Sequence, residues 1–217
     1  MPVTARPLPP YLVDRYRAWK ALRFEPNRVW HSHLAHSGQH PRAMVVSCCD
    51  SRVDVVGLFG AEPGDLFVVR NVANLIPAFA PDHLHHGTSA AVEYAVTVLQ
   101  VSHIVIIGHS QCGGVAACCA MCDGEAPELE TSFVGRWMDI LRPGYERLPA
   151  TDDQDARLRA LEKESVLVSL RNLETFPFVA AAVASGDLTL HGAWIDIAEG
   201  ALHLFDPATR QFEPVRA

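Results

Sequence analysis

Two short clusters of cysteine, histidine and charged residues each follow an apolar run that has the pattern of a buried strand. The first cluster spans residues 48–52 (CCDSR) and follows the run AMVVS at residues 43–47. The second spans residues 108–114 (GHSQCGG) and follows the run HIVII at residues 103–107. Thiolates and imidazoles are zinc ligands, and a site with only three protein ligands leaves one position open for chemistry. The residue types therefore favour a catalytic zinc site over a structural one.

The placement of these clusters predicts that their side chains converge. Cys48 follows the first strand-like run, and His109 and Cys112 lie in the loop after a later one. In open parallel sheets, reactive groups gather beyond the carboxyl ends of the strands. We therefore expect Cys48, His109 and Cys112 to bind one zinc ion.

Asp50 and Arg52 form a second candidate pair. They are two positions apart, so in an extended segment their side chains point the same way, and a bidentate pair keeps Asp50 ionised. Two arrangements are open. Asp50 either binds zinc as a fourth ligand and closes the site, or it stays paired with Arg52 and accepts a hydrogen bond from zinc-bound hydroxide.

From residue 43 onward the chain alternates strand-like and helix-like segments. The strand-like runs are 43–47, 65–70 and 103–107, and the helix-like segments are 88–99, about 113–121 and about 152–173. Two alternating segments, 188–197 and 201–205, are joined by Glu199-Gly200 and predict a hairpin. Apolar strands separated by helices indicate an α/β fold with a mostly parallel central sheet flanked by helices. The C-terminal hairpin is expected to add an antiparallel edge.

The residues before the first strand predict a helical arm. Residues 11–36 are polar and aromatic with a helical pattern that Pro26 interrupts. Apolar side chains in such a segment pack on their own domain or on a partner subunit. A chain of 217 residues suits one domain with a full core. We expect a single domain over 1–217, with the arm at 1–40 and a zinc-binding α/β core at 41–217.

Composition excludes several classes of function. The net charge is −7 and no basic run occurs, which argues against a nucleic-acid partner. No stretch approaches 18 uninterrupted apolar residues, so no membrane span is expected. The N-terminus has no apolar signal region, and a cytoplasmic location is the resulting expectation. In such a reducing compartment the six cysteines favour metal or catalytic chemistry over disulfides.

The motif set resembles the β-class carbonic anhydrases. The pattern Cys48-x-Asp50-x-Arg52 with His109-x-x-Cys112 is similar to that family's metal and catalytic motifs. Three further stretches are similar to its signatures: FVVRNVAN at 67–74, GTSAAVEYAV at 87–96 and GHSQCGG at 108–114. The resemblance covers roughly residues 11–210.

This resemblance implies the reversible hydration of carbon dioxide to bicarbonate and a proton through zinc-bound hydroxide. Zn²⁺ would be bound by Cys48, His109 and Cys112, with Asp50 and Arg52 as the catalytic dyad. The positions that match the carbon dioxide pocket of the plant-type branch are Gln39, Phe67, Val72, Tyr94 and Gly113.

The family's branches and assembly lead to further expectations. The bicarbonate-switched branch carries a tryptophan three residues before the first ligand, whereas this chain has Val45 there. The plant-type branch and an Asp50 that stays off the metal are therefore expected. The resemblance also implies a homodimer in which the arm embraces the partner, with a dimer of dimers as a further arrangement.

Two rival functions and one pH expectation follow from the same residues. Two thiolates cancel the formal charge of zinc, so the bound water should be less acidic than at a site of three imidazoles, and activity should rise above neutral pH. Carbonyl sulfide and carbon disulfide are linear electrophiles of similar size, and their hydrolysis is an alternative. A non-catalytic zinc or redox-sensing protein is the rival from another class.

Several other cysteines and histidines have two interpretations each. Cys49 stands where the family usually has serine or alanine, and it is expected to be a small buried side chain rather than a misplaced zinc ligand or an oxidation site. A second group is expected to fill the core rather than to form a second metal site: Cys118, Cys119 and Cys122. A histidine group is expected to lie in a polar loop, with proton relay as the alternative: His83, His85 and His86.

Overall fold

The computed structural model describes residues 4–82 and 86–216, which divide into two compact units, Met1–Gln39 and His40–Ala217. The first unit is helical. It contains α1 (Pro10–Trp19), a π-helical turn η1 (Lys20–Phe24) and α2 (Arg28–Ser37). Pro26 lies in the break before α2, where the sequence predicted an interruption.

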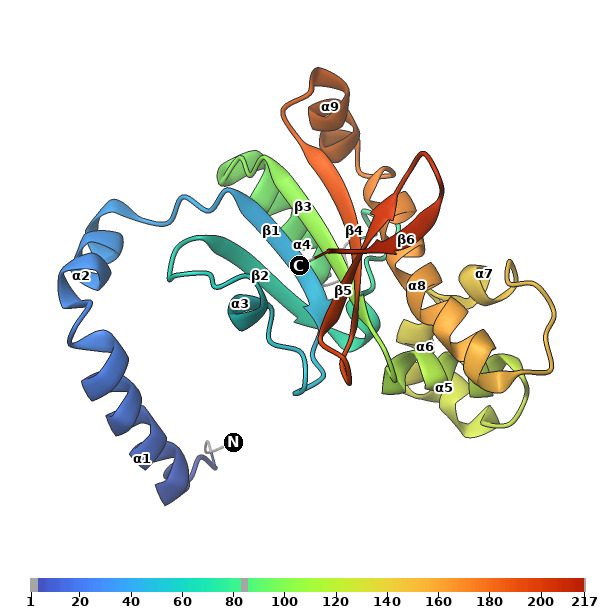
Figure 1. Cartoon of the computed structure of the whole chain (residues 1–217), viewed down its shortest axis with the longest axis horizontal. Coiled ribbons are helices and arrows are strands. Elements are labelled where there is room, and N and C mark those ends of the chain that lie inside the picture. The colour runs from blue at the N-terminus through green and yellow to red at the C-terminus, as the bar shows by residue number, and fades with distance from the viewer. Residues whose placement is uncertain (1–3, 83–85, 217) are drawn as a thin grey trace. The chain divides into compact units, whose positions relative to one another are not determined.

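The second unit is built on a six-stranded sheet with the strand order β2-β1-β3-β4-β5-β6 (Figure 1). The strands are β1 (Ala43–Cys48), β2 (Leu66–Asn71), β3 (His103–His109), β4 (Thr189–Asp196), β5 (Ala201–Asp206) and β6 (Gln211–Pro214). The pairs β1–β2, β1–β3 and β3–β4 are parallel, whereas β4–β5 and β5–β6 are antiparallel. The predicted mostly parallel sheet with an antiparallel C-terminal edge is confirmed. One detail differs, because β4 also belongs to the parallel part and a sixth strand, β6, extends the edge.

Helices occupy the connections between the strands. They are α3 (Val55–Leu58), α4 (Gly87–Glu93), α5 (Gly113–Cys122), α6 (Phe133–Met138), α7 (Arg142–Tyr145), α8 (Gln154–Leu173) and α9 (Pro177–Ser185). Short turns are η2 (Val72–Asn74) and η4 (Pro127–Thr131), which are 3-10 helices, and the π-helical η3 (Tyr94–Val98) that continues α4. The predicted helices correspond to α4 with η3, to α5 and to α8. The shortest helices span about one turn, which is too little for a helical period to stand out in the sequence.

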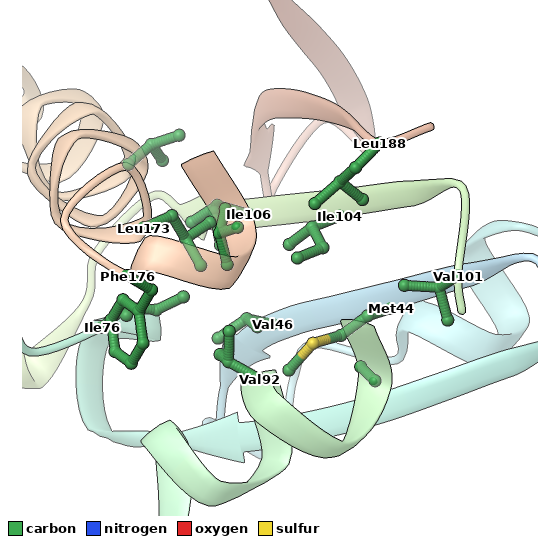
Figure 2. Close-up of a cluster of buried hydrophobic side chains, with 13 residues drawn as sticks. Met44, Val46, Ile76, Val92, Val101, Ile104, Ile106, Leu173, Phe176 and Leu188 are labelled. Atoms are coloured by element: carbon green, nitrogen blue, oxygen red, sulfur yellow. The ribbon is translucent and has the colours of Figure 1, made fainter. Parts of the chain in front are cut away.

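Both faces of the central strands β1 and β3 are buried. Met44 and Val46 of β1 and Ile106 of β3 pack in a cluster with Val92 of α4 and Leu173 of α8 (Figure 2). On the opposite face a different set packs together: Val45, Val53, Val55, Ile107 and Ala193. Complete burial of an aliphatic side chain contributes about 1.5–3 kcal/mol, so this core holds the strand ends in fixed positions.

Among the described residues, no single helix is both long and apolar enough to span a membrane. Helices α8 and α9 together have the length and composition of a span, but the chain bends by 90° between them.

Gly108 allows α8 to lie directly against β3. A Cβ at this position would lie 2.9 Å from Val166 Cγ2 and 3.1 Å from the backbone oxygen of Glu162. We expect Gly108→Ala to lower the free energy of unfolding by about 1–3 kcal/mol, because helix backbone cannot move aside cheaply. Urea denaturation measures this loss. Gly87→Ala is the control, since a Cβ there has nothing within 4 Å, and equal stability of the two variants would contradict the close packing of α8.

Candidate metal centre

Three potential metal donors meet at one edge of the sheet. Cys48 is the last residue of β1, His109 is the last residue of β3, and Cys112 immediately precedes α5. The strands β1 and β3 are parallel neighbours, so their carboxyl ends lie side by side. One ligand atom from each of the three residues lies within 4.8 Å of the others, and all three side chains are buried. The structure thus brings together the three residues that the sequence singled out as ligands.

The geometry of these donors fits a zinc ion. The Sγ atoms of Cys48 and Cys112 are 3.9 Å apart, and a tetrahedral zinc with Zn–S bonds of about 2.3 Å holds two sulfur atoms about 3.8 Å apart. His109 Nδ1 lies 2.8 Å from the Ser110 carbonyl oxygen, to which it donates as N–H. The other ring nitrogen, Nε2, is buried and has no hydrogen-bond partner in the described part of the chain. A hydrogen bond that fixes the tautomer and leaves Nε2 bare is the usual arrangement of a zinc-binding histidine.

The electrostatics of the donors also favour a cation. A hydrogen bond from the Cys112 thiol lowers the pKa of Cys48, and the Ala73 N–H lies 3.4 Å from the same sulfur. The hydrogen bond to Cys48 and burial raise the pKa of Cys112. Burial lowers the pKa of His109, but the nearby Cys48 sulfur and the Ser110 carbonyl raise it by more. The cluster therefore retains protons that a bound metal ion would displace.

Asp50 and Arg52 form the bidentate pair that their spacing predicted. Arg52 Nε donates to Asp50 Oδ1 at 2.9 Å, and Arg52 Nη2 donates to Asp50 Oδ2 at 2.7 Å. These hydrogen bonds hold the pKa of the Asp50 carboxyl well below its usual range. Arg52 Nη2 also donates to the Gln111 carbonyl oxygen at 3.0 Å, which ties the dyad to the second cluster. Asp50 is not part of the group of three donors. Its carboxylate is paired with Arg52, which corresponds to the arrangement in which Asp50 stays off the metal.

Sequence reasoning missed Arg70, which organises the backbone of the first cluster. Its Nε donates to the Cys48 carbonyl oxygen at 3.0 Å, and its Nη2 donates to the Asp50 carbonyl oxygen at 2.6 Å. Arg70 is the only charged residue in the run FVVRNV at residues 67–72. A single cation at the end of an apolar strand was the signal that could have identified it.

Two of the five predicted pocket residues lie beside the donors. Gly113 directly follows Cys112, and Val72 directly follows β2, next to the Ala73 N–H that contacts Cys48. A cavity of about 610 Å³ opens here, and Val72, Thr88 and Trp137 are among its lining residues.

Phe67 and Tyr94, two further predicted pocket residues, are not brought to the donors within one chain. The rings of Phe67 and Tyr94 pack against each other at 5.9 Å. The register of β1 and β2 places Phe67 opposite Met44 and Asn71 opposite Cys48. Four residues of strand correspond to about 13 Å, so the side chain of Phe67 belongs to a different region of the same sheet. Gln39 belongs to the other compact unit.

The expectation that Cys49 is buried is wrong. Its side chain is exposed and lines the cavity of about 610 Å³. Consecutive side chains of an extended segment point to opposite sides. Because the side chain of Cys48 is buried, that of its neighbour faces outward.

The cysteines of α5 are Cys118, Cys119 and Cys122. Cys118 is 1% exposed and packs with Met138 in the core. Burial raises the pKa of Cys118, and it raises the pKa of Cys119 to about 11. Neutral, packed thiols match the expected role of core filling, and none of these cysteines joins a group of three donors among the described residues.

Of the three histidines in the predicted polar loop, only His86 can be placed. Its Nε2 lies 2.6 Å from Asp82 Oδ1, and the residue lines the cavity beside Val72. His83 and His85 lie outside the described residues.

Comparison with known proteins decides the family. The family profile described as "Carbonic anhydrase" matches residues 43–202. The chain belongs to the carbonic anhydrase family. It is 36% identical over 194 residues to "Beta carbonic anhydrase 3" of Arabidopsis thaliana, an alignment that covers 87% of this chain and 73% of the relative.

Solved structures of β-carbonic anhydrases share this fold. The β-carbonic anhydrase CcaA superimposes with a TM-score of 0.81 at 29% identity, over 95% of this chain and 92% of that one. One of the tetrameric β-carbonic anhydrases from Sordaria macrospora superimposes with a TM-score of 0.76 at 31% identity, over 89% and 94% of the two chains. The predicted membership of the β class is confirmed, and the chain is an enzyme of the carbonate dehydratase type.

Proposed function

We propose that this chain catalyses the reversible hydration of carbon dioxide at a zinc ion held by Cys48, His109 and Cys112. The observation that supports the proposal most strongly is the donor cluster itself. Its two sulfur atoms are 3.9 Å apart. Asp50, the carboxylate nearest to Cys48 in the sequence, is paired with Arg52 and is not one of the donors. When bound, zinc acidifies a water molecule and so supplies the nucleophile for carbon dioxide.

The residues of the chain orient this nucleophile. Because Arg52 keeps Asp50 ionised, the carboxylate can accept a hydrogen bond from the attacking water and direct a lone pair toward the substrate. Arg70 fixes the backbone between Cys48 and Asp50. Val72 provides an apolar wall for a substrate that has no net charge. Val45, in place of the tryptophan of the bicarbonate-switched branch, favours the plant-type mechanism.

Stopped-flow measurement of carbon dioxide hydration on metal-analysed protein tests the proposal. One zinc per chain together with fast hydration would support it. Bound zinc without hydration, but with hydrolysis of carbonyl sulfide or carbon disulfide, would favour the sulfur substrates instead.

We further propose that the working enzyme is a homodimer, in which pairs of dimers can form tetramers, and that each pocket takes Gln39, Phe67 and Tyr94 from the partner chain. Within one chain Phe67 is offset along the sheet from Cys48. The helices α1 and α2 bury no residue, and Leu22 of η1 is 73% exposed. Apolar side chains on such an arm suit an interface between subunits.

Mixed dimers provide the test of shared pockets. Asp50→Asn and Phe67→Ala are each expected to impair homodimers, whereas a mixed dimer regains one intact site, which pairs the dyad of one chain with Phe67 of the other. Statistical mixing of the two variants by co-refolding should restore about a quarter of wild-type activity, because half of the dimers are mixed and each has one working site. A mixture of Asp50→Asn with Asp50→Ala is the control and should restore none. No recovery in the first mixture would place Phe67 in the site of its own chain.

Hydration activity is expected to rise between about pH 7 and pH 9. The two thiolates of Cys48 and Cys112 would offset the charge of a bound zinc ion, which would then acidify water less than at a site of neutral ligands. Arg52 already holds the pKa of Asp50 far below this range, so ionisation of Asp50 does not produce the rise. The pH dependence of kcat/KM measures it, and a profile that is already flat at its maximum by about pH 6 would contradict the assignment.

A further inference from the structure

Helix α8 carries a carboxylate that is buried beneath the metal centre. Glu162 is only 2% exposed, and its neighbour Leu161 belongs to the hydrophobic core. A buried carboxylate destabilises a fold unless hydrogen bonds compensate for its lost hydration. The catalytic and metal-binding roles proposed above do not involve Glu162.

The hydrogen bonds of Glu162 go to the turn that carries the third metal donor. The Cys112 N–H donates to Glu162 Oε1 at 3.2 Å. Burial raises the pKa of Glu162, and the backbone N–H groups of Cys112 and Gln111 oppose that rise. Two consecutive backbone N–H groups that face one anion form a nest. The side chain of Glu162 thus provides the acceptor for the N–H of Cys112, which is buried.

The turn itself adopts a conformation that needs support. Gln111 has φ +57°, in the left-handed region that non-glycine residues rarely occupy. On the other side of the turn, the Gln111 carbonyl oxygen accepts a hydrogen bond from Arg52 Nη2 at 3.0 Å. Gln111 therefore lies between the buried carboxylate and the dyad.

Glu162 is itself held in place. Its backbone oxygen accepts a hydrogen bond from Ser165 Oγ at 2.7 Å, and Ser165 Oγ accepts one from Asn74 Nδ2 at 3.1 Å. Gly108 brings β3 close to the same backbone oxygen. The carboxylate is consequently attached to a rigid part of the core.

We propose that Glu162 is a positioning residue that, as a hydrogen-bond acceptor, holds the turn at residues 110–112 so that Cys112 faces the other metal donors and Gln111 anchors Arg52. The expected effect on catalysis rests on the proposed function. The expected effect on metal binding rests on the donor cluster alone. Partners that orient metal ligands in this way typically change metal affinity or activity about 10–100-fold when they are removed.

Three substitutions of Glu162 separate the acceptor from the charge. Glu162→Gln keeps an oxygen in place without the charge, whereas Glu162→Asp keeps the charge but withdraws the oxygen by one methylene. Glu162→Ala removes both, and the adjacent cavity of about 210 Å³, which Gln111 and Glu162 line, gives water access to the freed N–H groups. Glu164→Ala is the matched control on the same helix, since Glu164 pairs with Arg147 and Arg171 instead of with the turn.

Zinc transfer to a chromogenic chelator and the thiolate-to-cobalt absorption of Co²⁺-substituted protein report on the site without any assay of activity. We expect Glu162→Gln and Glu164→Ala to bind zinc within about threefold of wild type, and Glu162→Asp and Glu162→Ala to bind it about 10–100-fold more weakly. In the hydration assay kcat should fall in the same order while KM changes little, because the dyad loses its anchor.

Each outcome bears on the inference. Wild-type zinc affinity and an unchanged cobalt spectrum in Glu162→Asp and Glu162→Ala would overturn it, as would a Glu162→Gln variant that binds zinc more weakly than Glu162→Asp. If Glu162→Ala fails to fold by near-ultraviolet circular dichroism, the comparison of Gln with Asp still decides. If wild-type protein binds zinc but does not hydrate carbon dioxide, the proposed function fails while the order of zinc affinities still tests Glu162.

Discussion

Replacing Asp50 by asparagine is expected to leave zinc bound while lowering kcat for carbon dioxide hydration by about 10²–10⁴-fold. Arg52 donates to both carboxylate oxygens and keeps Asp50 ionised. The asparagine amide is neutral, so the charged pair with Arg52 is lost. One of its two terminal atoms is an N–H donor, so only the amide oxygen remains to accept a hydrogen bond from the nucleophile. Stopped-flow kinetics and metal analysis of the same preparation separate loss of catalysis from loss of zinc.

Asp139 provides the matched control for this substitution. Arg142 Nε and Nη2 donate to Asp139 Oδ1 at 3.0 and 2.9 Å, and the pair is exposed. Asp139 is not one of the three metal donors. Asp139→Asn should therefore retain wild-type kcat. If Asp50→Asn were as active as Asp139→Asn, the dyad would have no catalytic role, and the non-catalytic zinc or redox-sensing function would gain support.

Replacing Cys112 by serine is expected to remove zinc together with activity. The substitution leaves two strong donors, Cys48 and His109, and a serine hydroxyl does not ionise at neutral pH to replace the thiolate. Bound zinc should fall from one per chain to well below it after dialysis, and hydration to less than about 1% of wild type. Inductively coupled plasma analysis and stopped-flow kinetics measure the two losses.

Cys119 is the control for this loss of metal. It lies on α5, the helix that begins directly after Cys112, but it is not one of the three donors. Burial raises the pKa of its thiol to about 11. Cys119→Ser should retain one zinc per chain. Full zinc binding by Cys112→Ser would show that the metal is bound elsewhere.

Local sequence patterns were sufficient to predict the main strands and the residues that meet at their ends. Apolar runs of five or six residues mark β1, β2 and β3, and the cysteine and histidine clusters begin at the last residues of β1 and β3. Parallel strands end at the same edge of a sheet. Strand position alone therefore indicated that Cys48, His109 and Cys112 would lie close together, and the spacing of Asp50 and Arg52 indicated their pairing.

Only the tertiary structure decided how distant segments meet. It placed β4 in the parallel part of the sheet, and it offset Phe67 from Cys48 through the register of β1 and β2. It also turned one carboxylate of the charged helix α8, Glu162, toward the backbone of a turn 50 positions earlier in the chain. Helical periodicity shows which residues share a face of a helix, but the partner of that face depends on packing between elements that the period does not encode. The sequence by itself therefore determined the donors and their chemistry, whereas packing and register determined which groups hold those donors in place.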